Sequence, residues 1–464
     1  MSLDNLPVEW KKIEISEICD PKQYKTIPIS ELTEDGFVVY GANGVIGKYS
    51  KFTHEKSTLM ITCRGATCGN LHISQPYSYI NGNAMALDNV SGHINLHYLY
   101  YCLKARGLED VISGSAQPQI TRQNLVNAEI IITSLKEQQE IVRQLDIMLA
   151  QVEQIKARLD AIPAILKKFR QSVLADAVSG KLTEEWRSVN PILESASQTK
   201  EKWLAQRREK FNEQYPKKKF KEPSLVDDKY MPWDEIPNDW DLVSVSEFAE
   251  CLDNLRVPIK KDDRNSNEGL YPYFGANGEV DRVDEFIIDD DIVLVTEDET
   301  FYGRTKPIAY RYYGKCWVNN HVHVLKAPTR EANDYLCYAL MYYHVIPWLT
   351  GTTGRAKLSQ AALNSLPLLM PPVKEIEVIV ANVNKLLEHA EKIENVIQSA
   401  QKRVNLLTQS ILAKAFSGEL TAEWREQHQD LITGVNSAEA LLAKNQKERE
   451  ASKPVKKTRV KKEA

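Results

Sequence analysis

The sequence predicts an α+β fold in which two mixed α/β domains alternate with two long helices, the second half of the chain repeating the first. Three observations predict it: a long segment occurs twice, each copy carries a helical hydrophobic seam, and a strand-rich segment precedes each copy. At 464 residues the chain can hold three or four domains with cores of their own. We therefore expect a pseudo-two-fold molecule that presents two sites or binds two partners.

The repeat is clearest at the end of each copy. Residues 171–187 return as residues 409–425, a shift of 238 positions (409 − 171) that holds without a gap back to Lys136 and Lys374. Each copy also carries apolar residues at alternating spacings of four and three, which keeps them on one stripe of a helix and is typical of a coiled coil. We expect the two helices to pack on each other; the alternative is a pair of core helices inside one globule.

The seam residues of the first copy are Ile141, Leu145, Met148, Val152, Ile155, Leu159, Ile162, Leu166, Phe169 and Val173. Those of the second copy are Ile379, Val383, Leu386, Ala390, Ile393, Ile397, Ala400, Val404, Leu407 and Ile411. Pro163 lies inside the first seam and should bend or locally break that helix, because proline lacks the amide hydrogen.

The ends of both helices carry recognisable signals. Ser134 with Glu137 resembles a capping box, and Pro371–Pro372 suits the start of the second helix. Gly180 and Gly418 stand where a left-handed residue ends a helix.

Composition favours a soluble modular protein. The net charge is −4, and no apolar run approaches the length of a membrane span. The chain begins with no signal segment, and seven scattered cysteines indicate reduced thiols, so we expect a cytoplasmic protein. Cysteine and histidine pairs are not accompanied by further ligands, and we expect no metal site.

These features divide the chain into six parts. They are a first mixed domain (1–135), a first helical spacer (136–190), a charged linker (191–231), a second mixed domain (232–373), a second helical spacer (374–425) and a C-terminal segment with a basic tail (426–464).

The mixed domains also repeat, although more faintly. Residues 40–44 match residues 274–278 at a shift of 234, and the same shift aligns residues 59–62 with 293–296 and Gly69 with Gly303. The loops between these anchors are then equal in length and unrelated in content. One frame with two different loops is typical of two readers of different ligands; ordinary drift after duplication is the alternative.

The sequence contains no convincing catalytic motif. Residues 41–48 miss the phosphate-binding loop by one position and have Tyr49 where that loop has Ser or Thr. The acidic run at 289–291 has no lysine at nuclease spacing. We therefore expect a non-catalytic binding subunit that serves enzymes elsewhere.

With these motifs in hand, the chain resembles the specificity subunits of type I restriction–modification systems, in the enterobacterial subfamily. Residues 156–187 and 403–425 look like the conserved repeats of that subfamily, with a paired Gly-x-Leu-Thr-x-Glu-Trp-Arg segment. The second copy departs from the family pattern at Ile376–Glu377, where the first has Gln138–Gln139, which leaves the local contacts open.

The resemblance implies two target-recognition domains joined by an antiparallel coiled coil, each reading half of a split, asymmetric DNA site. It implies no cofactor in this chain. Two modification (methyltransferase) subunits would use S-adenosylmethionine to methylate adenines, and two restriction (motor-nuclease) subunits would use ATP and Mg2+. The helices would act as a ruler, since 32 residues of helix span roughly 48 Å and one turn of DNA about 34–36 Å.

Basic and polar residues in the variable domains are the candidates for DNA contact. Arg64 could pair with guanine O6 and N7, and Asp298 or Glu299 could accept from cytosine N4, whereas phosphate clamping or a solvated turn are the alternatives. The basic stretches 207–221 and 453–462 could touch phosphates, bind an acidic partner or only solubilise the chain. A protein-binding scaffold and a nuclease acting alone remain as rival functions. The DNA-contact candidates are Lys48, Lys51, Arg64, Arg122, Asp298, Glu299, Arg304, Lys306, Arg355 and Lys357.

Overall fold

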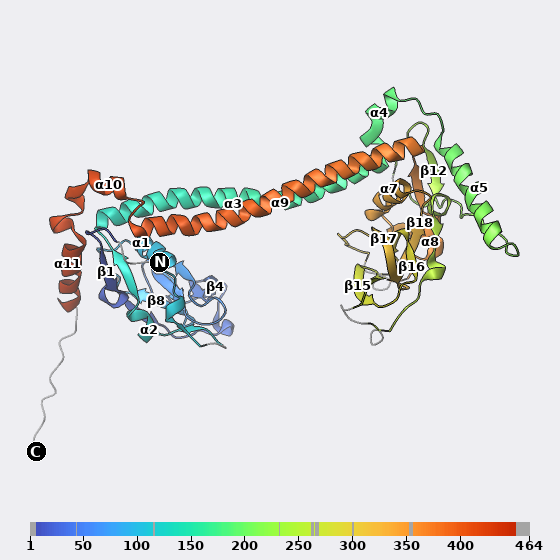
Figure 1. Cartoon of the computed structure of the whole chain (residues 1–464). Coiled ribbons are helices and arrows are strands. Elements are labelled where there is room, and N and C mark those ends of the chain that lie inside the picture. Colours follow the sequence, from blue (N-terminus) through green and yellow to red (C-terminus); the bar gives the residue numbers. More distant parts are fainter. Residues whose placement is uncertain are drawn as a thin grey trace, which may run out of the picture. The chain divides into compact units, whose positions relative to one another are not determined.

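The computed structural model describes residues 6–42, 44–114, 117–231, 233–260, 264, 269–298, 301–351 and 356–451. The chain divides into two compact units (Figure 1). The first unit comprises Met1–Asp160 and Gln398–Ala464, and the second comprises Ala161–Ile397. Each unit therefore holds one mixed domain and part of each long helix.

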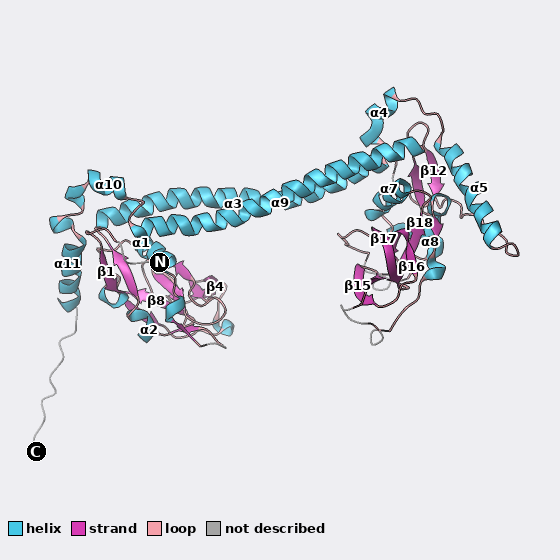
Figure 2. Ribbon diagram, in the orientation of Figure 1, coloured by secondary structure: helices cyan, strands magenta, loops and turns pink. Residues whose placement is uncertain are grey.

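The two predicted helices are present as α3 (Leu135–Val178) and α9 (Val373–Ser417) (Figure 2). In the first unit, Ile141 near the start of α3 shares a hydrophobic cluster with Leu412 near the end of α9. Farther along, Gln401 Nε2 donates to Asp160 Oδ1 at 2.7 Å. Residue numbers rise along one helix as they fall along the other, so the helices pack antiparallel here.

The second unit repeats this pairing with the other helix halves. Val173 of α3 lies in one cluster with Ile379 of α9. Arg170 Nη2 forms an ion pair with Glu394 Oε2 at 2.6 Å. The order of contacts again gives an antiparallel pair, as the coiled-coil prediction requires.

Two expectations for the helices need correction. The predicted break at Pro163 is wrong, since α3 runs through it as one helix. The seam is also not buried throughout: Ile155, Ile393 and Leu407 are 44%, 47% and 43% exposed. A pair of helices covers only one side of each stripe, so seam positions far from the globular domains stay partly in solvent.

The helix starts show how the two copies differ. Ser134 Oγ accepts from the Glu137 amide at 3.2 Å, which is one half of the predicted capping box. Gln138 is buried and accepts from the Asn95 amide at 2.9 Å, whereas its counterpart Ile376 lies in the hydrophobic core of the second unit. The departure from the family pattern thus exchanges a polar contact for apolar packing.

The first mixed domain is built from short strands in several small sheets (Figure 1). A four-stranded sheet has the order β2-β8-β5-β6, a three-stranded sheet β4-β3-β7, and β1-β11 and β9-β10 form pairs. The strands are β1 (Lys11–Glu14), β2 (Asp20–Gln23), β3 (Phe37–Gly41), β4 (Gly44–Tyr49), β5 (Leu59–Thr62), β6 (Leu71–Ile73), β7 (Tyr79–Ile80), β8 (Ala84–Asp88), β9 (Ile112–Ser113), β10 (Gln119–Ile120) and β11 (Glu129–Ile132).

The second mixed domain joins the same layout into one six-stranded sheet, in the order β13-β18-β16-β17-β14-β15, with a β12-β19 pair beside it. Its strands are β12 (Asp241–Ser244), β13 (Glu250–Cys251), β14 (Tyr271–Gly275), β15 (Gly278–Val283), β16 (Ile288–Thr296), β17 (Ala309–Val318), β18 (Val322–Lys326) and β19 (Pro367–Met370).

Strand β17 explains why one domain has a single large sheet and the other has two. It pairs with β16 along eight positions and then with β14, so it covers the roles of both β6 and β7. In the first domain the segment between β6 and β7 contains Pro76, which has no amide to donate, and Tyr77, whose φ is 52°. These two residues interrupt the ladder.

The shorter helices cover the sheets and the helix ends (Figure 2). They are α1 (Leu96–Arg106), α2 (Arg122–Val126), α4 (Glu184–Val189), α5 (Ala196–Gln214), α6 (Val245–Phe248), α7 (Arg330–Met341), α8 (Gln360–Ser365), α10 (Ala422–Gln427) and α11 (Ala438–Ala451). Helix α5 lies inside the segment 191–231, which we had predicted to be only a charged linker.

Helices α5 and α11 extend the internal repeat beyond the part visible in the sequence. Arg207 of α5 donates to the carbonyl oxygen of Ser246 at 2.7 Å, and Arg449 of α11 donates to that of Ser16 at 3.2 Å. The two arginines are 242 positions apart (449 − 207), and each fastens its helix to the mixed domain of its own unit.

A buried carboxylate joins the repeat to the mixed domain in the first unit. Glu137 has no exposed surface and accepts from Trp10 Nε1 at 2.8 Å. It also accepts from Thr421 Oγ1 and Arg425 Nη1, each at 2.7 Å. The guanidinium of Arg425 lies over the Trp10 ring, 5.5 Å from its centroid. We call this cluster of Trp10, Glu137, Thr421 and Arg425 the first junction.

The second junction has the same chemistry at equivalent positions. Glu375, also fully buried, accepts from Trp240 Nε1 at 2.8 Å and Thr183 Oγ1 at 2.6 Å, and it pairs with Arg187. The Arg187 guanidinium lies 5.7 Å from the Trp240 ring centroid. Trp10 and Trp240 thus occupy equivalent places, each beside the Glu, Thr and Arg of its own junction.

A glycine beside each junction makes this close approach feasible. Gly180 and Gly418 have φ angles of 81° and 86°, as predicted for a left-handed helix end. A Cβ atom on Gly180 would overlap Pro237, and one on Gly418 would overlap Pro7. Glycine is therefore required by both conformation and space.

Candidate nucleic-acid interface

The backbone builds the same edge in both mixed domains, where the central strand ends. In the first domain the Cys63 amide donates to Asn83 O, and the Ile120 amide donates to Cys63 O, both at 3.0 Å. Arg64 then forms an isolated bridge with Gln119. This edge brings together residues from three separate parts of the sequence.

The second domain repeats the pattern bond for bond. The Glu297 amide donates to His321 O at 3.1 Å, and the Leu358 amide donates to Glu297 O at 2.8 Å. Asp298 forms the isolated bridge, here with Lys357. We call the set Arg64, Asn83 and Gln119 the first edge, and the set Asp298, His321 and Lys357 the second edge.

The loops that follow the central strands are not equal in length, contrary to the sequence alignment. Thr62 N donates to Asn70 O and Thr296 N to Ile308 O, both at 2.8 Å, so these bonds are equivalent. The loops 63–70 and 297–308 therefore differ by four residues, and Gly303 is not the counterpart of Gly69. A constant shift between anchors cannot detect an insertion that falls between them.

The basic candidates of the first domain differ in how free their side chains are. Lys48, at the end of β4, and Lys51 are exposed. Arg64 is exposed as well, and no hydrogen bond or ion pair involves its side chain among the described residues. Arg122 begins α2 and donates through Nε to Pro21 O at 2.9 Å, so part of its guanidinium is occupied.

In the second domain, Asp298 is engaged rather than free. Both of its carboxylate oxygens accept from His321 Nδ1, at 2.7 and 2.9 Å, and Lys357 Nζ lies 3.2 Å from Oδ2. The side chains of His321 and Lys357 are 50% and 52% exposed, against 21% for Asp298. The cationic side chains, not the carboxylate, face solvent most.

The remaining candidates of this domain lie on the inserted loop or outside the described residues. Arg304 donates through Nη2 to Asn277 Oδ1 and Pro307 O, both at 3.0 Å, which ties the loop to itself and to the β14–β15 turn. Lys306 is exposed. The predictions for Glu299 and Arg355 lie outside the described residues.

A buried charged cluster supports the second edge from below. His323 is fully buried; Nδ1 contacts Asp253 Oδ2 at 2.6 Å and Nε2 contacts Leu358 O at 2.7 Å. Each ring nitrogen therefore faces an oxygen of a different segment, which holds the ring in place. Arg256 pairs with Glu297 and, at 3.1 Å, with Asp253.

Electrostatics keep this cluster ionised. Burial acts to raise the pKa of Asp253, but the hydrogen bond and charge of His323, the Val324 amide and the charge of Arg256 outweigh it and lower that pKa. The first domain has neutral residues at the corresponding places, with Gln23 Nε2 donating to the Cys63 sulfur at 2.9 Å. The two domains thus share backbone geometry at the edge but place neutral residues beneath it in one case and charged residues in the other.

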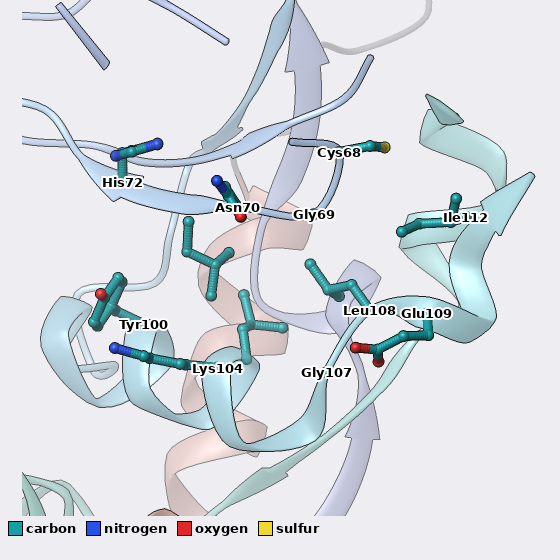
Figure 3. A pocket seen from close by; sticks show the side chains of 12 residues that line it. Cys68, Gly69, Asn70, His72, Tyr100, Lys104, Gly107, Leu108, Glu109 and Ile112 are labelled. Atoms are coloured by element: carbon teal, nitrogen blue, oxygen red, sulfur yellow. The ribbon is translucent and has the colours of Figure 1, made fainter. Parts of the chain in front are cut away.

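A pocket of about 400 Å3 lies behind the loop of the first domain (Figure 3). Tyr100 and Lys104 of α1 line one side, and Asn70 and His72 line the other. None of the DNA-contact candidates lines it, so it is separate from the first edge.

Sequence reasoning missed Asn83, Gln119 and His321. Each lies far in sequence from the residue it joins at the edge, and only the strand pairing brings them together. Among the described residues, no cluster of three or more His, Cys, Asp or Glu side chains has the arrangement of a metal site. The part of the chain that was described also has no helix long and apolar enough to cross a membrane.

A family model and the related proteins agree on one family for this chain. A sequence model of the type I restriction modification DNA specificity domain matches residues 7–164 and 237–400. The EcoDI specificity subunit of Escherichia coli is 29% identical, over 97% of this chain and 98% of that protein. The EcoKI specificity subunit of Escherichia coli strain K12 is 34% identical, over 71% of this chain and 65% of that protein.

Two solved structures share the fold. The HsdS subunit from Thermoanaerobacter tengcongensis covers 89% of this chain and 98% of its own, with a TM-score of 0.52 and 14% identity. A chain from a study of complex assembly and conformational transition of the type I R-M system covers 89% of this chain and 99% of its own, with a TM-score of 0.59 and 14% identity. With its two matched domain segments and their repeated junctions, the chain belongs to the family of type I restriction–modification specificity subunits, the non-catalytic DNA-recognition members of these systems.

Proposed function

We propose that this specificity subunit reads a bipartite, asymmetric DNA site, with residues 1–135 and 232–373 as its two target-recognition domains. The observation that carries the proposal is the pair of edges: equivalent backbone hydrogen bonds display Arg64, Asn83 and Gln119 in one domain and Asp298, His321 and Lys357 in the other. Two domains with the same backbone geometry but different polar side chains are suited to binding two different half-sites.

The chain would direct enzymes rather than act as one. Its helical spacers, residues 136–190 and 374–425, would bind two modification subunits that methylate adenines with S-adenosylmethionine. Two restriction subunits, which use ATP and Mg2+, would complete a cytoplasmic restriction complex. Residues 191–231 would link the first spacer to the second recognition domain, and residues 426–464 would follow the second spacer as a C-terminal segment with a basic tail.

The candidate side chains divide into two roles under this proposal. Exposed cations such as Lys48, Lys51 and Lys306 would neutralise phosphates, which positions the protein without reading sequence. Arg64, with a free guanidinium at the first edge, would donate to guanine O6 and N7. The rest of the proposed DNA-contact set is Arg122, Asp298, Glu299, Arg304, Arg355 and Lys357.

Domain exchange tests the bipartite reading. Residues 1–135 are replaced by those of a relative, the modified chain is produced with its modification subunits, and methylated adenines are mapped across a genome. We expect one half of the methylated motif to change and the other to stay. A change in both halves contradicts independent reading.

The ruler role has its own test. Four residues, about one helical turn, are inserted between Ala150 and Lys156, which adds ~6 Å of helix. The unread spacer of the methylated motif should lengthen while both half-sites persist. An unchanged spacer contradicts the ruler.

A protein-binding scaffold is the rival function, and a gel-shift separates the two. The chain with a modification subunit is titrated with genomic and random duplexes of equal length. Sequence-dependent binding supports the specificity role, and absence of any DNA binding supports the scaffold.

A further inference from the structure

We propose that Asn83 and His321 are specificity-determining residues at equivalent positions of the two domains, and that Asp298 positions His321 instead of reading a base itself. The inference rests on the proposed DNA-reading function and deepens it. It names two residues that the sequence did not single out and changes the role expected for Asp298.

The equivalence comes from backbone hydrogen bonds and not from sequence alignment. The residue after each central strand donates to the carbonyl of Asn83 in one domain and of His321 in the other, at 3.0 and 3.1 Å. The following residue forms the bridge to Gln119 or Lys357. Each edge therefore presents three side chains in the same order: one that follows the central strand, one from the turn before β8 or β18, and one from the bridged segment.

In the first edge, alternation along the two bridged segments turns Arg64 and Gln119 outward. Cys63 and Ile120 are buried, while the adjacent Arg64 and Gln119 are exposed. Successive residues of a strand face opposite sides, so the outward members form one small polar surface. Asn83 is exposed beside them, and no side-chain hydrogen bond engages it among the described residues.

The residue types of the first edge are those that read bases. An amide such as that of Asn83 or Gln119 can bond an adenine through N6 and N7, and a guanidinium can bond a guanine. The electrostatic part of phosphate binding comes from lysine and arginine, and the amides of Asn83 and Gln119 bring no charge to it. The first edge thus fits base recognition better than backbone clamping.

The second edge differs because two of its own side chains, Asp298 and His321, pair with each other. His321 Nδ1 donates to the Asp298 carboxylate, so this bond orients the ring and leaves Nε2 as its outward polar atom. The Asp298 carboxylate is also paired with Lys357. A carboxylate with two protein partners has little capacity left for a cytosine amino group, whereas His321 has a free ring nitrogen.

The test is selection from a library of duplexes with randomised bases, using the full chain with its modification subunits. We expect His321→Ala to relax one position in one half-site and Asn83→Ala to relax one position in the other. A lost bidentate or ring contact of ~1–3 kcal/mol corresponds to roughly a 5- to 150-fold loss of discrimination. His97→Ala on α1 and Asn212→Ala on α5, both exposed, are the matched controls and should change nothing.

The outcomes separate failure of the inference from failure of the proposed function. If the unaltered chain selects a motif and both variants select it equally well, the assignment of Asn83 and His321 is overturned while DNA reading stands. If a variant weakens all sequences alike and lowers the salt slope by about 0.9, the residue is a phosphate contact and the inference fails. If the unaltered chain shows no preference, the proposed function falls and the inference with it.

A double-mutant cycle tests the positioning role of Asp298. Asp298→Ala should relax the same base position as His321→Ala, and the double variant should be no worse than His321→Ala alone. Asp298→Asn, which keeps an acceptor for Nδ1, should restore part of the discrimination. An additive effect in the double variant, or a changed base preference in Asp298→Asn, assigns the reading to Asp298 and overturns the proposal. Circular dichroism confirms that each variant is folded, and His321→Asn replaces His321→Ala if that variant is not.

Discussion

The two mixed domains share a backbone frame but differ in what fills it. The first places Gln23 and Cys63 beneath its edge, and the second places Asp253 and Glu297 there, with the buried ring of His323 between them. The edge hydrogen bonds are nevertheless the same in both. The same backbone hydrogen bonds therefore form over neutral residues in one domain and over charged residues in the other. The exposed side chains of the edge can change without a change of fold.

The junctions show the opposite behaviour, because here both units keep the same four residue types. The largest effect should therefore come from removing their carboxylates. Glu137→Ala and Glu375→Ala each leave a part-buried arginine, a buried threonine and a buried tryptophan without their acceptor and should cost about 3–5 kcal/mol of unfolding free energy. Denaturant titration of both variants measures the loss.

Glu377→Ala is the control for this pair, since Glu377 is exposed on α9 and forms an ion pair with the exposed Lys374. It should stay within ~0.5 kcal/mol. A gap of more than about 2 kcal/mol between the two junction variants would break their equivalence, because the same groups are lost in each.

A second prediction sharpens the difference between the domains. Asp253→Ala removes the partner of His323 and Arg256 and should destabilise the second unit by about 3 kcal/mol. Gln23→Ala, the corresponding change in the first domain, should cost ~1 kcal/mol or less. Hydrogen exchange of each unit, followed by mass spectrometry, locates the loss.

The pH dependence of this effect has a definite sign. The folded-state pKa of Asp253 is lower than its ordinary value of 3.8, so its contribution is fully present above that value. It is lost as the pH falls through the lower, folded-state pKa. The difference in stability between the unaltered chain and Asp253→Ala should therefore shrink below pH 3.8. A difference that grows on acidification contradicts the ionised cluster.

A third prediction concerns the docked helices α5 and α11. Arg207→Ala and Arg449→Ala should each cost about 1.5–3 kcal/mol, because charge-assisted hydrogen bonds to backbone carbonyls are lost. Limited proteolysis should then cut within α5 or α11 before it cuts elsewhere. Lys210→Ala, exposed on α5, is the control. Unchanged proteolysis in both arginine variants would show that other contacts hold these helices.

The smallest expected loss of stability comes from replacing glycines. These variants separate the cost of a left-handed backbone from the cost of a steric overlap. Gly180→Ala and Gly418→Ala should cost about 1–3 kcal/mol, since a left-handed conformation is combined with overlap on a proline. Gly44→Ala and Gly278→Ala have positive φ with open space around the added carbon and should cost only ~1 kcal/mol. Thermal unfolding compares the four; equal losses would mean that the prolines yield.

The sequence predicted the features that local patterns encode. The four-three spacing located α3 and α9, and Gly180 and Gly418 marked the ends of these two helices because left-handed backbone favours glycine. The pattern overstated the burial of Ile155 and Leu407, since periodicity shows which stripe is apolar and not what covers it. Pro163 did not break α3, which runs through it as one helix.

What the sequence could not provide are contacts between distant segments. Glu137 and its partner Thr421 are 284 residues apart, and no spacing rule connects them. The same holds for Asn83 and His321, which become neighbours of Arg64 and Asp298 only through strand pairing. The four-residue insertion before β17 was invisible for a related reason, because the flanking anchors alone fixed the alignment.

The discontinuous make-up of the first unit has a consequence for biosynthesis. Residues 161–397 form the second unit as one uninterrupted stretch, so it can fold completely while translation continues. The first unit must wait, because Thr421 emerges 284 residues after Glu137. At about 5–20 residues per second that delay is roughly 15–60 s. During it the acceptor Glu137 and the apolar face that receives Phe416 lack their partners on the nascent chain, and we expect chaperones to be most needed in this interval.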